Sequence, residues 1–332
     1  MTVFSAVLLA LSGCVMMTGD APAEYKETRL YYGTYVTIRC LYGEGTPISG
    51  IIARCWDEAG RIQTAMDVRS ASGDVGRINA SGGLGVRVGS GVYGLLKDSI
   101  EFSRLTGGAF DVTVYPLVEV WRTAARDNRL PDKAVLEEAK SKIGYQYVHL
   151  GGDNTVTLRK SGMKIDLGAI AKGYAVDRIA RILSAGGIEN FLVDAGGDIF
   201  CRGKNSSGSD WNVGIRDPIK AGGLIGSIRI SGAAVTTSGD YERFYRIDGE
   251  RFSHILNPAT GYPGRTVISA TVIAKTAEEA DALATALCAL EGEEGIRLTE
   301  KIDDVEAMVI EKADGELRML TTEGFPDIKR KQ

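Results

Sequence analysis

The chain of 332 residues has no excess of positive charge, and it has few cysteines and histidines. Its formal net charge of −4 argues against a nucleic-acid-binding protein, which would present a basic face. No two of its five cysteines have CxxC spacing, so the sequence contains no zinc or redox motif of that kind. Apolar residues make up 44% and charged residues 25%, as in an ordinary globular protein.

The apolar run near the start, residues 3–11 (VFSAVLLAL), is too short to span a bilayer. It leads into the small residues of LSGC, and this arrangement is typical of an export signal. The ending at Cys14 resembles a bacterial lipobox, in which the cysteine is lipidated, although no Lys or Arg precedes the run. A plain signal peptide with an incidental cysteine is the alternative.

The lipobox interpretation divides the chain into three parts. We expect a lipoprotein signal over residues 1–14, a polar tether over 15–24 and one domain over 25–332. The expected location is outside the cytoplasm, with a lipid anchor in the bacterial inner membrane and the domain facing the periplasm.

Two phosphate-binding motifs are absent or incomplete. The chain has no Walker A loop. Residues 89–94 (GSGVYG) fit the dinucleotide pattern G-x-G-x-x-G, but the strand before them is only a few residues long and no regular βαβ unit surrounds them. Because Ser90 is also a plain N-cap residue, the sequence favours an ordinary helix start here.

The order of the predicted elements is mixed. We predict strands over residues 29–42, 145–150, 155–159, 190–194, 198–202, 211–215 and 225–237. Helices are predicted over 47–66, 90–105, 131–142, 168–185 and 277–290, the last with a capping box of Thr276 and Glu279. Asp-Gly pairs at 248–249 and 314–315 predict two hairpins. Since strands and helices do not alternate regularly, the α+β class fits best.

Two glycine-containing segments place carboxylates where a ligand could lie. In TGGAFDVTVYPL, residues 106–117, Asp111 could accept a hydrogen bond from a ring N–H or a ribose hydroxyl; an N-capping Asp at a loop-to-strand junction is the alternative. In KIDLGAIAKGYAVDRIA, residues 164–180, a strand end turns at Gly168 into a helix whose N-terminus suits an anion. Lys172 could reach a phosphate and Asp166 a ribose or flavin edge, and a solvated Lys is the alternative.

A polar pair interrupts the Ala/Leu-rich helix predicted near the C-terminus. Asp281 and Thr285 are four residues apart and therefore share one face of that helix. A carboxylate and a hydroxyl oxygen are suitable ligands for Mg²⁺, which substrate phosphates often complete. The alternative is a solvated Asp281 beside a threonine that bonds back to the helix carbonyl.

His254 lies in SHILNPATG, residues 253–261, and is one of two histidines in the chain. This segment and VTTSGDYERF, residues 235–244, flank a predicted hairpin, so Ser238 and His254 could lie close together. A histidine is suited to proton transfer near neutral pH, and a structural histidine is the alternative.

Seven motifs, in this order, resemble the ApbE family of FAD:protein FMN transferases over residues 29–290. They are YGT (32–34), TGGAFDVT (106–113), DLGAIAKGYAVD (166–177), VDAGGDI (193–199), VTTSGDYER (235–243), SHILNPATG (253–261) and ADALATA (280–286). The number and order of the matches make the resemblance specific.

The resemblance implies an ApbE-like, T-fold-like α+β architecture with an FAD-binding cleft between lobes. It implies Mg²⁺-dependent transfer of FMN from FAD to a Thr hydroxyl of a membrane or periplasmic flavoprotein, with release of AMP. The implied Mg²⁺ ligands are Asp281, Thr285 and the Ala169 carbonyl, and the implied base is His254. The expected contacts to FAD are Tyr32, Ala109, Phe110, Asp111, Asp166, Lys172 and Ile255, together with Ser238 from its predicted place beside His254.

The sequence also departs from the family pattern. Tyr32 stands where the family often has Met, Ala259 where it often has Arg, and residues 66–70 lack a commonly present aromatic residue. Stacking of a base on an aromatic ring contributes about 1–3 kcal/mol, so the missing ring predicts looser FAD retention. Two alternatives stay open: an FAD pyrophosphatase that uses water, and a non-catalytic periplasmic FAD-binding lipoprotein.

Overall fold

The structure is a computed structural model that describes residues 22–220, 222–241, 243–313 and 315–329. The predicted lipobox at Cys14 and most of the predicted tether lie outside the described residues. The first strand begins at Ala23, so residues 23 and 24 belong to the fold and not to a tether. Within the described ranges, no helix is both long enough and apolar enough to cross a membrane.

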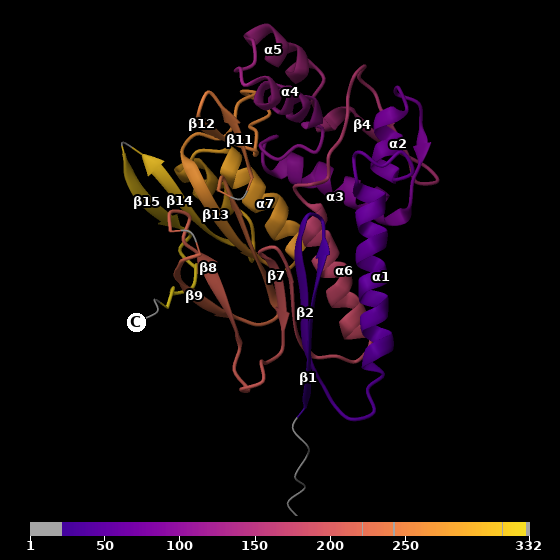
Figure 1. Ribbon diagram of the computed structural model, residues 1–332, viewed down its shortest axis with the longest axis vertical. Coiled ribbons are helices and arrows are strands. Elements are labelled where there is room, and N and C mark those ends of the chain that lie inside the picture. Colours follow the sequence, from indigo (N-terminus) through magenta and orange to yellow (C-terminus); the bar gives the residue numbers. More distant parts are fainter. Residues whose placement is uncertain (1–21, 221, 242, 314, 330–332) are drawn as a thin grey trace, which may run out of the picture.

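An eight-stranded antiparallel sheet forms the centre of the described chain (Figure 1). In spatial order its strands are β1 (Ala23–Tyr31), β2 (Thr34–Tyr42), β6 (Asn190–Ala195), β7 (Asp198–Arg202), β10 (Ala233–Gly239), β13 (Val267–Ala274), β14 (Glu306–Ala313) and β15 (Glu316–Thr321). Helices pack on this sheet without regular strand–helix alternation, which confirms the predicted α+β class.

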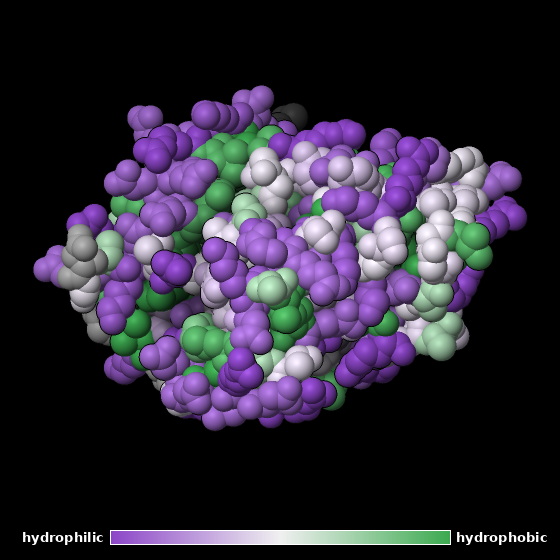
Figure 2. Space-filling model, turned by 90° about the horizontal axis from the view of Figure 1, so that it is seen from above, coloured by the Kyte–Doolittle hydropathy of each residue, from purple (hydrophilic) through white to green (hydrophobic). Residues whose placement is uncertain are grey.

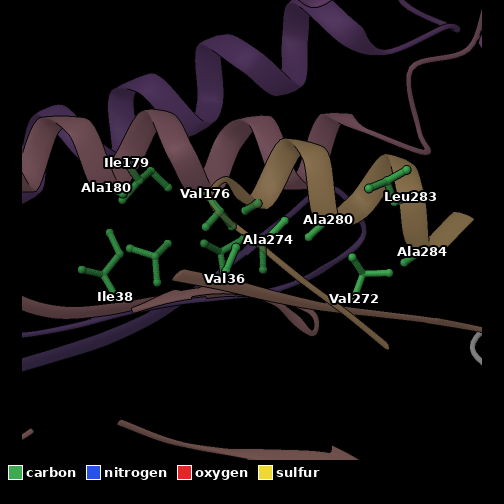
Figure 3. Close-up of a cluster of buried hydrophobic side chains, with 14 of the residues drawn as sticks. Val36, Ile38, Val176, Ile179, Ala180, Val272, Ala274, Ala280, Leu283 and Ala284 are labelled. Carbon is green, nitrogen blue, oxygen red and sulfur yellow. The ribbon is translucent and has the colours of Figure 1, made fainter. Parts of the chain in front are cut away.

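Helices cover one face of this sheet. They are α1 (Ile48–Met66), α6 (Ala171–Ala185) and α7 (Ala277–Ala289), and α8 (Gly292–Thr299) follows them beside β14. Figure 3 shows Val36 and Ile38 of β2 pointing toward Val176 and Ile179 of α6. The absence of a side chain at Gly173 of α6 allows close approach to α7, since a Cβ there would lie 2.1 Å from the carbonyl oxygen of Ala277 at the start of α7.

The other face of the sheet is covered by the hairpin of β8 (Trp211–Arg216) and β9 (Leu224–Ile230). Side chains alternate between the two faces of a strand. Along β14, Ala307 and Val309 therefore join the helix-covered core, whereas Met308 and Ile310 pack with Trp211. The sheet is thus buried on both faces at β14, whereas its edge strands β1 and β15 are largely exposed.

A second group of elements packs against α7 and extends beyond the sheet (Figure 1). It comprises α2 (Asp74–Ala80), β3 (Val86–Arg87), α3 (Ser90–Leu105), α4 (Tyr115–Asp127), α5 (Lys133–Ser141), the 3₁₀ helix η1 (Tyr145–Tyr147), β4 (Val148–Gly151), β5 (Thr155–Leu158), β11 (Phe244–Ile247) and β12 (Glu250–Ser253). Figure 2 views the end that carries α4, α5 and the β11–β12 hairpin, where hydrophilic side chains predominate.

Several predicted boundaries are wrong. The strand predicted over 29–42 is the β1–β2 hairpin, whose turn holds Tyr32 and Gly33 at φ of 56° and 71°. The strand predicted over 225–237 is likewise two strands, β9 and β10, separated by a turn in which Gly232 has a φ of 72°. In both cases a residue in the left-handed region reverses the chain inside a continuous β-type pattern.

Other elements were not predicted. Helices α2, α4 and α8 and strand β13 were not predicted, and residues 106–117, for which a loop-to-strand junction was one interpretation, lead into α4. Helix α4 begins at Tyr115, and the fixed φ of Pro116 is compatible with its first turn. The helix after the GSGVYG segment is capped by Gly89, so Ser90 is its first residue and not its N-cap.

Several other predictions agree with the structure, but the strand predicted over 145–150 begins with the 3₁₀ helix η1 and only then becomes β4. The Thr276 hydroxyl accepts a hydrogen bond from the Glu279 N–H at 3.2 Å, which confirms the N-terminal half of the capping box. The Asp248–Gly249 turn joins β11 to β12, and β14 pairs with β15. The four described cysteines, at positions 40, 55, 201 and 288, are buried free thiols, including the two predicted to be so, Cys55 and Cys288.

Candidate active site

Helix α7 lies between two apolar cores, and this position creates the site. Ala280, Leu283 and Ala284 pack into the sheet core, whereas Ala282 and Ala286 pack into the core of the second group of elements. The remaining stripe carries Asp281 and Thr285, which line a cavity of about 660 Å³. The i, i+4 spacing therefore places the predicted polar pair where the two parts of the fold meet.

The cavity collects the predicted site residues from distant parts of the sequence. Its lining includes Ala109, Phe110, Asp111, Asp166, Ala169, Lys172, Ser238, His254, Ile255, Asp281 and Thr285. Tyr32 is the exception, because its hydroxyl donates to the Ala59 carbonyl of α1 at 2.9 Å. The next two residues, Gly33 and Thr34, line the cavity in its place.

Two buried carboxylates and one ammonium group form a carboxylate cluster: Asp198, Asp281 and Lys172. Lys172 Nζ forms ion pairs with Asp198 and, at 3.3 Å, with Asp281 Oδ1. Both aspartates are only 1% exposed, and the Gly173 N–H donates to Asp281 Oδ2 at 3.0 Å. Burial, followed by the charge of Asp281, raises the pKa of Asp198 well above its usual value. The cluster is thus a buried site in which two carboxyl groups share one ammonium group.

The structure argues against the alternatives left open for Asp281, Thr285 and Lys172, in which the charged groups are solvated and the threonine bonds to its own helix. Asp281 is buried and Lys172 is ion-paired, so neither is simply solvated. Several threonines and serines in the described helices donate to the carbonyl four residues earlier, but no such bond is found for Thr285 in the same ranges. Its hydroxyl oxygen is therefore not committed to the helix backbone.

The donor set around Asp281 fits Mg²⁺. In the described part of the chain, no group of three or more His, Cys, Asp or Glu side chains could hold a metal ion. The predicted set uses one carboxylate, the Thr285 hydroxyl and the Ala169 carbonyl, and all three lie on the cavity. Mg²⁺ prefers such oxygen ligands and usually keeps sites for phosphate or water. The surplus of buried acidic groups also favours a cation here.

The segment before α6 positions Asp166 and Ala169, although it is not the predicted strand end. Residues 164–167 belong to no strand. Asn79 holds them by accepting from Ile165 N–H at 2.7 Å and donating to the Ile165 carbonyl at 2.8 Å. The Gly168 N–H donates to Asp166 Oδ1 at 2.8 Å, and burial raises the pKa of Asp166. Helix α6 then begins at Ala171, so Lys172 lies in its first turn.

Asp111 anchors the loop on which it lies. Its Oδ1 accepts hydrogen bonds from the Thr113 N–H at 2.8 Å and hydroxyl at 2.6 Å, and its Oδ2 accepts from the Tyr145 N–H at 3.0 Å. Burial raises the pKa of this carboxyl against the effect of these bonds. Phe110 beside it is 1% exposed and packs edge-on against Phe102. This part of the cavity wall is therefore fixed by its own contacts.

His254 follows β12 and is held by the Arg243 backbone. Its Nδ1 lies 2.8 Å from the Arg243 carbonyl oxygen, which can only accept a hydrogen bond. Nδ1 therefore carries the proton and Nε2 keeps its lone pair. Burial, with the charges of Arg243 and Lys172, lowers the pKa of His254 to about 4. The sequence analysis expected a pKa near neutrality; the structure instead keeps the imidazole neutral and able to accept a proton at pH 7.

Residues 32–309 match the sequence model of the ApbE family. The chain belongs to the ApbE family. The FAD:protein FMN transferase of Treponema pallidum is 35% identical over 309 residues, which cover 86% of this chain and 84% of that protein. A protein of the same name from Klebsiella pneumoniae is 34% identical over 256 residues, which cover 76% of this chain and 79% of that protein.

Solved ApbE structures share the fold. The flavin transferase ApbE from Vibrio cholerae superposes with a TM-score of 0.81 at 28% identity and covers 92% of this chain and 98% of its own. The ApbE protein of Thermotoga maritima superposes with a TM-score of 0.82 at 33% identity and covers 91% and 97%. The ApbE-like fold expected from the motifs is therefore confirmed.

In this ApbE chain, the loop after His254 is fixed by Asn257 of the SHILNPATG motif. Its Oδ1 accepts from the Ala259 and Thr260 N–H groups at 2.8 and 3.1 Å. Its Nδ2 donates to the Ala289 carbonyl at the end of α7 at 2.8 Å. The motif thus ties the segment that carries His254 to the helix that carries Asp281.

Some cavity residues of this ApbE chain were not predicted. Asp198, which is ion-paired with the cavity residue Lys172 but is not itself part of the lining, lies in the matched VDAGGDI motif, where a carboxylate after a Gly-Gly turn was an available signal. The cavity is also lined by Arg122, Arg216, Arg243 and Phe244. Arg122 is on α4, which was not predicted, and the other three carry no spacing pattern that marks them in the sequence.

Proposed function

We propose that this chain is an FAD:protein FMN transferase, which moves FMN from FAD to a threonine hydroxyl of an acceptor protein and releases AMP. The names of its relatives support the transfer reaction. The observation that carries the proposal is the joint placement of a neutral His254 and the buried Asp281 on one cavity. A proton acceptor and a cation site are the two groups that transfer of a phosphoryl group to an alcohol requires.

In the proposed reaction, the threonine oxygen attacks the phosphorus on the FMN side of the FAD diphosphate. A bond forms between that oxygen and phosphorus, and the bond from phosphorus to the bridging oxygen breaks, so AMP leaves. His254 Nε2 takes the proton of the threonine hydroxyl, while the Arg243 carbonyl holds Nδ1–H in place. General-base catalysis of this kind contributes about 10²- to 10⁴-fold to a rate.

The charge of the diphosphate must be balanced during the reaction. Mg²⁺, held by Asp281, Thr285 and the Ala169 carbonyl, supplies that balance when bound. The N-terminus of α6 lies beside these residues and adds the positive end of its dipole. Lys172, which is ion-paired with Asp198 and lies 3.3 Å from Asp281 Oδ1, would be placed to contact a phosphate oxygen of FAD.

The proposed location is the periplasmic face of the bacterial inner membrane, with a lipid anchor at Cys14. The support is the sequence pattern of residues 1–14. The acceptors would then be flavoproteins of membrane or periplasmic redox systems, and anchoring raises the effective concentration at which enzyme and acceptor meet. Replacement of Cys14 by Ser, followed by membrane fractionation, tests this: the variant should leave the membrane fraction.

The reaction is tested by incubating the purified protein with FAD and Mg²⁺, with and without a purified periplasmic flavoprotein that carries threonine-linked FMN, prepared without its flavin. Transfer predicts both AMP and flavin fluorescence that stays on the denatured acceptor, and EDTA should abolish both. Equal AMP release without acceptor would instead identify the protein as an FAD pyrophosphatase. Bound FAD without any AMP would identify the non-catalytic binding protein.

A further inference from the structure

The outer face of the β1–β2 hairpin carries an exposed apolar pair beside its turn. Leu30 and Tyr35 are direct cross-strand partners, and their side chains are 68% and 71% exposed. Because side chains alternate along strands, the next residues, Tyr31 and Val36, point to the opposite face. There Tyr31 stacks on Trp56 of α1, and Val36 is buried in the core. We call Leu30 and Tyr35 the hairpin pair.

The apolar character of this outer face is confined to the end near the turn. The preceding cross-strand pair on the same face is Thr28 with Thr37, whose hydroxyls are hydrogen-bonded at 2.9 Å. The pair before it is Lys26 with Arg39. Single exposed apolar residues are ordinary on a protein surface, but two that are paired across strands at one end of a polar face indicate an interaction site.

The turn beside the hairpin pair is part of the cavity wall. Thr34 lines the cavity and directly precedes Tyr35 in the sequence. Gly196 also lines the cavity, and its N–H donates to the Tyr35 carbonyl at 3.1 Å. Within the turn, the Tyr32 carbonyl accepts a hydrogen bond at 3.3 Å from Arg243, a third residue of the lining. The hairpin pair is therefore continuous with the rim of the candidate active site.

The proposed transfer requires a whole protein to reach this cavity. A folded acceptor is far larger than a cavity of about 660 Å³, so only the segment around its threonine can enter. A specific protein interface covers about 800 Å² on each partner, so it must extend from the mouth of the cavity onto the rim. Tyrosine is among the residues that contribute most to such interfaces.

The membrane is a less suitable occupant for this surface than the acceptor. Strand β1 begins at Ala23, on the side of the proposed lipid anchor, and it extends over about 27 Å to Tyr31 at the usual rise of a strand. In Figure 1 the hairpin rises from the lower end of the molecule, and its turn lies at the upper end of the two strands. The hairpin pair is thus at the end of β1 farther from the proposed anchor.

We infer that Leu30 and Tyr35 form a docking surface for the acceptor protein, where they pack against apolar side chains next to its target threonine. This inference rests on the proposed function, which makes a protein the second substrate. Neither side chain belongs to the cavity lining, so the hairpin pair takes no part in holding FAD or the cation. Its contribution should appear in the affinity for the acceptor and not in the chemical step.

The test measures the rate of FMN transfer as a function of acceptor concentration, with saturating FAD and Mg²⁺. The acceptor is the purified periplasmic flavoprotein that carries threonine-linked FMN, prepared without its flavin. Leu30→Thr combined with Tyr35→Thr should raise KM for the acceptor about tenfold or more, with kcat and FAD affinity nearly unchanged. Threonine retains a preference for strands, so the hairpin should still form. Tyr35→Phe alone should keep the wild-type KM.

The matched control is Leu317→Thr combined with Met319→Thr on β15. This strand is the opposite edge of the same sheet, and both side chains are 53% exposed and lie off the cavity. The control variant should have the wild-type KM for the acceptor. An equal rise of KM in both double variants would show a general effect of lost apolar surface and would overturn the inference.

The other possible occupants of the hairpin pair are tested in parallel. Analytical ultracentrifugation detects a second copy of this chain, and flotation with vesicles of phosphatidylethanolamine and phosphatidylglycerol, in a Cys14→Ser background, detects a lipid surface. If self-association or vesicle binding depends on the hairpin pair while KM does not, the inference is wrong. If wild type transfers FMN and the folded double variant has a normal KM, the inference alone fails. If wild type neither transfers FMN nor releases AMP, the proposed function fails and the inference fails with it.

Discussion

The carboxylate cluster and the β11–β12 hairpin border the same cavity but are built in opposite ways. Asp198 and Asp281 are almost fully buried, and each has specific partners on α6. Phe244, Arg246 and Arg251 are exposed on a short two-stranded hairpin. The interaction between buried charges is stronger because their surroundings have a low dielectric constant, whereas exposed side chains are free to adjust to a ligand. The proposed chemistry belongs to the buried cluster, and His254 directly follows the exposed hairpin.

Removing His254 should give the largest effect on the chemistry. We expect His254→Ala to lower the rate of FMN transfer about 10²- to 10⁴-fold while FAD still binds, because the proton acceptor is lost. The measurement is the rate of flavin attachment to the acceptor under saturating FAD. His149→Ala is the matched control, since the other histidine lies on β4 away from the cavity and should retain full activity. Normal transfer by His254→Ala would contradict its role.

A methyl group at Gly173 should disturb the buried cluster. Its Cβ would lie 2.1 Å from the Ala277 carbonyl oxygen, and the same residue donates to Asp281. We expect Gly173→Ala to reduce the free energy of unfolding by about 1–3 kcal/mol, as overpacking does, and to weaken Mg²⁺ activation. Chemical denaturation measures the change in the free energy of unfolding.

The control for Gly173→Ala is Gly94→Ala on α3. No heavy atom lies within 4 Å of the added Cβ at Gly94. This change should leave stability unchanged or raise it by up to about 1 kcal/mol, because alanine favours a helix more than glycine does. Equal stability of the two variants would show that α6 and α7 are not packed as tightly as described.

Glu278, at the start of α7, should make stability depend on pH. Burial, followed by the charges of Asp98 and Asp177, raises the pKa of Glu278 to about 8, although Arg181 acts in the opposite direction. The folded state therefore binds more protons than the unfolded state between about pH 4.5 and 8, so this residue lowers stability as pH rises through that window. We expect Glu278→Gln to raise the free energy of unfolding at pH 8.5 by on the order of 1–3 kcal/mol.

Denaturation at pH 5 and pH 8.5 tests the Glu278 prediction. The stabilisation should be present at pH 8.5 and nearly absent at pH 5, where the carboxyl is already protonated in the folded state. Glu294→Gln on the exposed side of α8 should have no such pH dependence. If Glu278→Gln changed the free energy of unfolding by the same small amount at both pH values, the pKa of Glu278 would not be raised.

The smallest expected effect is that of pH on the free enzyme through His254. Its pKa of about 4 means that the imidazole is already unprotonated at pH 5.5. The value of kcat/KM should therefore show no decrease near pH 6.5 that depends on this residue, and the decrease should occur nearer pH 4. An inflection between pH 6 and 7 that disappears in His254→Gln would contradict the lowered pKa.

The sequence predicts the buried half of the site better than the exposed half. Asp281 and Thr285 can be found from their i, i+4 spacing in an otherwise small and apolar helix. The ion pair between Lys172 and Asp198 could not be predicted in this way, because it joins residues of α6 and β7 that are distant in the sequence. Phe244 has an ordinary strand pattern, and only the fold places it on the cavity.

Local backbone conformation explains the other differences. Tyr32 was predicted to contact FAD, but the left-handed turn at this position directs its ring to α1. Residues 112–114 have a strand-like composition, but the Thr113 N–H donates to Asp111 Oδ1 in a turn. Helix α4 then begins at Tyr115, with Pro116 in its first turn. Neither outcome follows from propensity, because side-chain hydrogen bonds and tertiary packing decide both.

The central claim is that a divalent cation beside Asp281 promotes cleavage of the FAD diphosphate. The most direct measurement is AMP release from FAD across a Mg²⁺ titration, in the presence of acceptor, for wild type, Asp281→Asn and the exposed-surface control Asp303→Asn. Wild type and Asp303→Asn should need Mg²⁺, and Asp281→Asn should be slower by about 10²-fold or more while it still binds FAD. Mg²⁺-dependent AMP release at the wild-type rate by Asp281→Asn would contradict the account.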